Sequence, residues 1–66
     1  MRDYSNSEIS NIIDEWIHNK RDREALKMAY IDGDTHETIA EHFLISPRTV
    51  DNIIAKGTLV IEQHMQ

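Results

Sequence analysis

Histidines are the side chains in this 66-residue chain best suited to bind a metal ion or transfer a proton, and there are four of them. Structural zinc sites usually include cysteine, which the chain lacks. His36 and His42 stand six positions apart, whereas two zinc ligands on one helix face stand four apart. The sequence also has no glycine-rich phosphate loop and no nucleophile with an identifiable base. We therefore expect no metal, cofactor, small-molecule substrate or enzymatic activity.

The charged residues limit the class of partner. The formal net charge is −5 at pH 7, and acidic residues outnumber basic ones in both halves of the chain. Nucleic-acid binders are usually basic, because neutralising phosphates supplies most of their nonspecific affinity. The composition therefore argues against strong DNA binding by an isolated monomer. The basic run "KRDR" at 20–23 could line a DNA backbone, or it could be a solvated surface.

The length predicts a single helical domain over residues 1–66. A chain this short buries only about 60 % of the surface that its unfolded form exposes. Without cysteine it has no disulfides, so a helical core or self-association must stabilise it. No apolar run approaches the ~18 residues of a membrane span, and no secretory leader is recognisable. We expect a soluble, cytoplasmic protein.

Apolar residues at helical spacing predict two supporting helices at about 6–31. Ser5 and Glu8 have the spacing of a capping box at the start of the first. The second, at about 20–31, has Asn19 as a candidate N-cap and Gly33 in the left-handed position after its end. We expect the first helix to bury a stripe made of Ile9, Ile12, Ile13, Trp16 and Ile17.

Two further helices are predicted, separated by the only proline. The shorter one opens at Asp34 or Thr35, either of which can cap it. Ser46 can cap the longer one, and Pro47 suits its first position, where a missing N–H costs nothing. This helix runs over about 47–64, with one buried stripe formed by Val50, Ile54, Gly57 and Ile61. We interpret Gly57 as a close approach between helices, with a local kink as the alternative.

The spacing of these last two helices is typical of a DNA-binding helix-turn-helix, at about 35–57. Ala40 would lie where the two helices cross and only a small side chain fits. Ile45 would anchor the turn in the core, and Val50 would anchor the second helix. We therefore predict an all-α, four-helix domain that contains a helix-turn-helix. An unrelated helical bundle is the alternative.

The stretch "REALKMAYIDGDTHETIAEHFLISPRTVDNIIAKG" resembles region four of bacterial sigma factors, the domain that reads the −35 promoter element. The shared features are "ALKMAY", "DGD", "TIAEHF", "ISPRTV" and "IIAKG", and the resemblance covers about residues 21–63. LuxR-type regulators share the core, but the spacing in the last helix is more similar to the sigma pattern. From its 66 residues we expect no core-polymerase-binding or −10-reading domain, and therefore not a complete sigma factor. The resemblance therefore implies a small stand-alone regulator of bacterial or phage type.

The resemblance implies that the last helix enters the DNA major groove by its N-terminal turns. Arg48 can bond guanine or a phosphate, and Asn52 can read adenine through two hydrogen bonds. Lys56 and Lys27 match positions that contact the DNA backbone. The implied DNA-binding residues are Lys27, Thr35, Ser46, Pro47, Arg48, Thr49, Asp51, Asn52 and Lys56.

Three residues depart from the family pattern. Asp51 stands where Arg or Lys is usual, and its carboxylate repels phosphates unless it accepts from a cytosine amino group. Leu44 stands where Gly is frequent, so a left-handed conformation there would carry about 1 kcal/mol or more of strain. Ile54 is apolar where family members can be polar, which widens the apolar side of the last helix.

Two functions remain open. The first is a sequence-specific DNA-binding transcriptional regulator that acts as a homodimer. We expect Ile53, Val60 and His64 to extend the apolar stripe into a dimer or partner face, with burial under the first helix as the alternative. The second function is a protein-interaction module that keeps the fold, has weak or no DNA binding, and binds RNA polymerase or another regulator.

Overall fold

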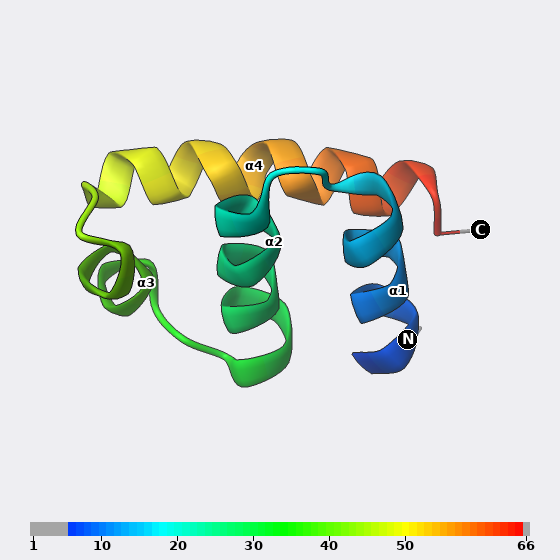
Figure 1. The fold of residues 1–66 in the computed structure, drawn as a ribbon, viewed down its shortest axis with the longest axis horizontal. Helices are drawn as coiled ribbons and strands as arrows, with labels where there is room; N and C mark the ends of the chain where they lie inside the picture. The colour runs from blue at the N-terminus through cyan, green and yellow to red at the C-terminus, as the bar shows by residue number, and fades with distance from the viewer. Residues whose placement is uncertain (1–5, 66) are drawn as a thin grey trace.

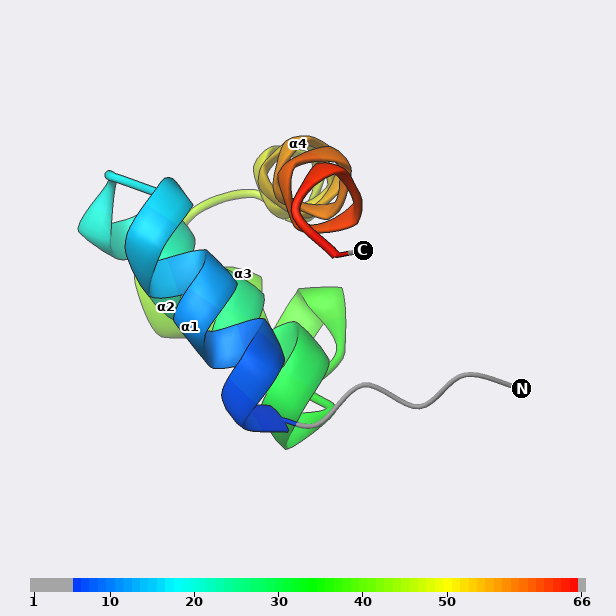
Figure 2. The same ribbon diagram turned by 90° about the vertical axis from the view of Figure 1, so that its right-hand side faces the viewer.

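Four α-helices and one π-helical turn make up the part of the chain that the computed structural model describes, residues 6–65. They are α1 (Asn6–Trp16), α2 (Lys20–Lys27), η1 (Met28–Asp32), α3 (His36–Phe43) and α4 (Pro47–Gln63). Within residues 6–65 there is no strand, and the all-α prediction is confirmed. Figure 1 shows α4 running along the length of the molecule, past α3, α2 and α1 in turn. Seen from its end in Figure 2, α4 lies to one side of the other helices.

Polar side chains begin α2 and α3 at the predicted places. The Asn19 side-chain oxygen accepts from the Asp22 amide at 3.1 Å, at the start of α2. Thr35, and not Asp34, caps α3: its hydroxyl oxygen accepts from the Thr38 amide at 3.1 Å. Each cap satisfies one of the amides that a helix leaves without an internal partner.

The turn between α3 and α4 is built as the sequence predicts. Leu44 adopts the left-handed conformation, with φ 58°, and ends α3. Ser46 then caps α4 by accepting from the Thr49 amide at 3.2 Å, and Pro47 takes the first helical position. The proline therefore starts α4 and does not interrupt a helix, because its missing N–H lies among amides that have no helical partner.

The second predicted helix is not α-helical to its end. Its α-helical part stops at Lys27, and η1 continues the chain as a wider π-helical turn. The amides of Gly33 and Asp34 both donate to the Met28 carbonyl, the second at 2.9 Å. Gly33 is left-handed, with φ 74°, as predicted. The helical segment predicted at about 20–31 is confirmed, but its last turn has π winding, which apolar spacing does not distinguish from α winding over a few residues.

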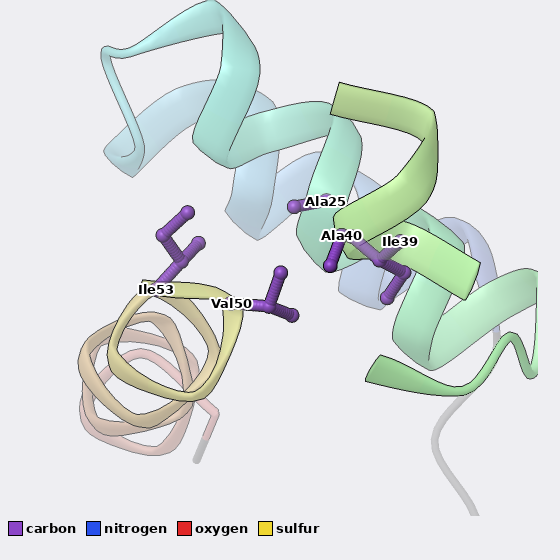
Figure 3. Packing of buried hydrophobic residues seen from close by; sticks show 5 residues of the cluster. All are labelled: Ala25, Ile39, Ala40, Val50 and Ile53. Atoms are coloured by element: carbon purple, nitrogen blue, oxygen red, sulfur yellow. The ribbon is translucent and has the colours of Figure 1, made fainter. Parts of the chain in front are cut away.

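One part of the core lies between α2, α3 and the N-terminal half of α4. Figure 3 shows Val50 and Ile53 directed from α4 toward side chains of the other two helices. Ala40 is 3 % exposed in this cluster, so a small residue does lie where α3 and α4 meet. Ile45 packs against the same cluster, as predicted. The buried members are Ala25, Ile39, Ala40, Val50 and Ile53.

The second part of the core lies between α1, α2 and the C-terminal half of α4. Its buried members are Ile13, Leu26 and Ile61, and Ile54 packs against both parts. A Cβ placed on Gly57 would lie 2.4 Å from a methyl carbon of Leu26. Because α4 continues unbroken through this position, Gly57 marks a close approach between α2 and α4, which confirms the first of the two interpretations.

Trp16 is exposed, and the prediction that it joins the core was wrong. It is the last residue of α1 and is 46 % exposed. Its ring stacks on the His64 ring, with centroids 4.0 Å apart and an angle of 4° between the planes. Ile13, one turn earlier, fills the core position between α2 and α4. The predicted cap Ser5 lies outside the described residues.

Candidate nucleic-acid interface

The first turns of α4 have one side in the core and the other exposed. Val50 and Ile53 are directed inward, toward α2 and α3 (Figure 3). The opposite side of the helix carries five of the predicted DNA-binding residues in exposed positions, namely Pro47, Arg48, Asp51, Asn52 and Lys56. A helix that is held along one side and free along the other has the geometry required to enter a major groove.

Arg48 and Asn52 stand one helical turn apart and carry the groups best suited to base edges. The Arg48 guanidinium can donate two hydrogen bonds to guanine, or bind a phosphate. The Asn52 amide can donate to and accept from adenine. Both side chains belong to exposed residues of α4. The structure therefore places a guanine-type donor and an adenine-type amide on the same exposed surface.

A groove between α4 and the beginning of α2 extends this surface. Asn52 and Lys56 line it from α4, and Arg21 lines it from α2. Arg21 is exposed, with its guanidinium 3.3 Å from the Asp22 carboxylate. Two cations thus flank Asn52, an arrangement suited to DNA phosphates. The sequence signal for Arg21 was the run "KRDR", for which a solvated surface was an equal interpretation.

Lys27 is not brought to this groove. Its ammonium nitrogen lies 2.7 Å from the Asp14 carboxylate of α1. Lys27 is half-buried, and it is not among the residues that line the groove beside Asn52. Arg21 and Lys27 both have a carboxylate partner, but only Arg21 lines the groove, so Arg21 is better placed for a backbone phosphate.

Two predicted contact residues, Thr35 and Ser46, serve as helix caps, and their hydroxyl groups also bond neighbouring threonines. The Thr35 hydroxyl donates to the Thr38 hydroxyl oxygen at 2.9 Å. The hydroxyl oxygens of Ser46 and Thr49 are also 2.9 Å apart. Both caps are exposed, and Thr49 lines the groove beside Asn52. These groups hold the starts of α3 and α4 in place next to the exposed side of α4.

Asp51 contacts a histidine of the preceding helix. Nδ1 of His36 lies 2.5 Å from Oδ1 of Asp51. The two residues are fifteen positions apart, on the first turn of α3 and the second turn of α4. No sequence pattern signals this contact, because it depends on the angle at which the two helices pack. The carboxylate that departs from the family pattern therefore has a hydrogen-bonding partner within the protein.

Comparison with protein families shows what kind of domain this surface belongs to. The family model described as "Sigma-70, region 4" matches residues 19–57, more than half of the chain. The chain belongs to the sigma-70 region 4 family. The match runs from the cap of α2 through η1 and α3 to Gly57 of α4, so it includes the helix-turn-helix. No curated protein and no solved structure gives a significant match.

The sigma-70 region 4 family is a family of DNA-binding helix-turn-helix domains and is not a class of enzymes. Three of the histidines lie in separate surroundings: His36 bonds Asp51, His42 packs edge-on against Phe43, and His64 stacks on Trp16. Within residues 6–65, no group of three or more His, Cys, Asp or Glu residues could hold a metal ion. None of the helices described is long and apolar enough to cross a membrane.

The dimer or partner face predicted for this sigma-70 region 4 domain is not continuous. Ile53 is 7 % exposed and lies in the core with Ala25, so its assignment to an exposed face was wrong. The physical reason is that α2 packs across α4 on this side. Val60 is half-buried and lines the groove, while His64 is exposed and stacked on Trp16.

Proposed function

We propose that this sigma-70 region 4 domain is a sequence-specific transcriptional regulator that inserts the first turns of α4 into the major groove. The observation that carries the proposal is the exposed pair Arg48 and Asn52 on a helix anchored by Val50. Base contacts through such side chains specify sequence, whereas phosphate contacts fix position. The proposed location is the cytoplasm, where a regulator of this type meets its DNA.

The proposed phosphate contacts surround the base-reading pair. Lys56 and Arg21 lie on opposite walls of the groove that contains Asn52. The exposed caps Thr35 and Ser46 can add hydrogen bonds to phosphates at the starts of the two helices. We leave Lys27 out of the proposed interface, because it does not line this groove and its ammonium is paired with Asp14 of α1.

Arg48→Ala and Asn52→Ala test the proposal in gel-shift titrations against duplexes selected from a randomised pool. Each substitution should weaken specific binding by about 1–3 kcal/mol, because each removes a base contact. Gln63→Ala is the matched control: it changes an exposed residue at the other end of α4 and should bind as the parent does. Unchanged affinity in both Arg48→Ala and Asn52→Ala would contradict the assignment of α4 as the reading helix.

We propose that the regulator binds DNA as a homodimer on paired half-sites. The net charge of −5 supports this, because a single copy with few phosphate contacts would bind weakly. Two copies on adjacent half-sites would combine their affinities. Size-exclusion chromatography with light scattering, with and without the selected duplex, should give two chains per duplex. One chain per duplex at saturation would contradict this part of the proposal.

Binding to RNA polymerase is the second candidate function. Leu59 favours it, because this large apolar side chain is 61 % exposed on the same side of α4 as Arg48. Polymerase should then co-purify with the protein in the absence of promoter DNA, and Leu59→Ser should abolish the association. A DNA isotherm with steep salt dependence, and no retained polymerase, would count against it.

A further inference from the structure

We propose that His36 and Asp51 act as a base-reading pair, in which His36 holds the Asp51 carboxylate to accept a hydrogen bond from a cytosine amino group. This inference rests on the proposed function and assigns a base preference to the same surface. Asp51 is the specificity-determining residue, and His36 is a positioning residue that acts through it.

The contact between the two side chains leaves the carboxylate available. Nδ1 of His36 lies 2.5 Å from Oδ1 of Asp51, so the pair uses one carboxylate oxygen. The side chain of Asp51 is 62 % exposed and that of His36 is 43 % exposed. A carboxylate has about four acceptor positions on its two oxygens. Oδ2 can therefore accept from a ligand while Oδ1 stays bonded to the histidine.

Both ends of the pair are attached to well-anchored backbone. Thr35 caps α3 immediately before His36, and Ile39, one turn later, is fully buried in the core. Val50, which is fully buried, precedes Asp51 on α4. The carboxylate is thus oriented before DNA arrives, and less side-chain freedom is lost on binding.

The position of Asp51 on α4 makes it a neighbour of the two proposed base contacts. It follows Arg48 by three residues and precedes Asn52 directly, and all three residues are exposed. The histidine N–H dipole is directed at the carboxylate, which offsets part of its repulsion of the nearby phosphates. The surface therefore combines an arginine for guanine, an amide for adenine and an oriented acceptor.

The chemistry of the major groove selects the base. Cytosine presents its N4 amino donor, which aspartate accepts. Guanine and thymine present acceptor oxygens, whose lone pairs repel a carboxylate, and adenine presents its amino donor beside the N7 acceptor. A single oriented carboxylate is best satisfied by cytosine. We expect cytosine at the position that faces Asp51, with guanine and thymine rejected.

The experiment measures the affinity of the full chain for four versions of its selected duplex, which differ only in the base pair that faces Asp51. The unmodified protein should prefer cytosine by about 10-fold. Asp51→Asn should lose this preference, because an amide donates as well as accepts. His36→Leu should reduce the preference by removing the hydrogen-bond donor to Asp51. His36→Asn should keep the preference, because the Asn amide nitrogen, like Nδ1 of His, is bonded to Cγ and can donate from a similar place.

A second histidine on α3 provides the matched control. His42→Leu changes an exposed ring that packs on Phe43, and it should keep the cytosine preference. The inference is overturned if Asp51→Asn keeps that preference. It is also overturned if His36→Leu weakens binding to all four duplexes equally, which is the result expected if the contact only holds the two helices together. In either case a loss of binding in Arg48→Ala leaves the proposed function standing. A protein that selects no sequence overturns both.

Discussion

At the scale of single residues, the turn before α4 carries a leucine in a conformation that favours glycine. Leu44 has φ 58° and ψ 43°, and its side chain is 91 % exposed. Its amide donates to the Glu41 carbonyl at 3.3 Å, and the Ile45 amide donates to the Ala40 carbonyl at 3.0 Å. These two bonds form a Schellman motif, which requires a left-handed residue at this place. The side chain thus adds strain without adding buried contact.

Leu44→Gly should therefore stabilise the protein. Relief of the left-handed strain, about 1–2 kcal/mol, exceeds the greater chain entropy that glycine gives to the unfolded state, about 0.4–1 kcal/mol. The free energy of unfolding, measured by urea denaturation, should rise by up to about 1 kcal/mol. Leu44→Ala is the control: it removes the exposed side chain but keeps Cβ, so it should bring no comparable gain. Equal stability of the glycine and alanine variants would refute the assignment of strain.

At the scale of the helices, α2 and α4 pack closely at Gly57, and this contact helps to fix the position of α4. Leu26 is fully buried and occupies the space that a side chain on residue 57 would need. Ile54 packs against both parts of the core, so α4 is held along most of its length. Interiors are packed densely enough that one added methyl group is felt.

Gly57→Ala should lower the free energy of unfolding by about 1–3 kcal/mol through overpacking. In a helix interior, alanine is more favourable than glycine by about 1 kcal/mol. The cost of overpacking must exceed this gain for the variant to be less stable than the parent protein. Ala55→Gly, at an exposed position of the same helix, measures the helix-propensity term alone. In the double variant with Leu26→Ala, the two costs should be less than additive, because space is freed where the methyl group enters. Additive costs would mean that residues 26 and 57 do not compete for the same space.

At the scale of the whole molecule, the proposed function requires an acidic chain to bind a polyanion. The net charge is −5, yet Arg48, Lys56 and Arg21 are exposed along α4 and the groove beside it. DNA binding depends on the phosphates that such cations neutralise, and each neutralised phosphate makes the slope of log affinity against log salt more negative by about 0.9. A few well-placed cations, and not the overall charge, should therefore govern the salt dependence.

Lys56→Ala and Arg21→Ala should each weaken binding to all duplexes similarly and reduce the salt slope by about 1. Titrations at several salt concentrations measure this slope. Lys27→Ala is the matched control: it removes a lysine that does not line the groove, and its slope should equal that of the parent protein. If the salt slope fell for Lys27→Ala and stayed unchanged for Arg21→Ala, DNA would lie on the other side of α2.

Local features of the fold and of the candidate site could be predicted from the sequence. The caps Asn19, Thr35 and Ser46, the proline that starts α4 and the left-handed Gly33 depend on contacts within a few residues. Such contacts are decided by local geometry, so residue type and spacing suffice. The choice of Arg48 and Asn52 as candidate base contacts came from the family resemblance, and both residues are exposed in the structure.

Only the tertiary structure decided which neighbour covers each side of a helix. Helical spacing shows that Ile53 shares a side with other apolar residues, but not that α2 packs over it. The same spacing placed both Ile13 and Trp16 in the core, but only Ile13 is buried, and Trp16 stacks on His64 at the surface. The contact between His36 and Asp51 likewise exists only because α3 and α4 pack at a particular angle. Burial and long-range pairing depend on how separate helices are oriented, and that orientation results from packing across the whole core.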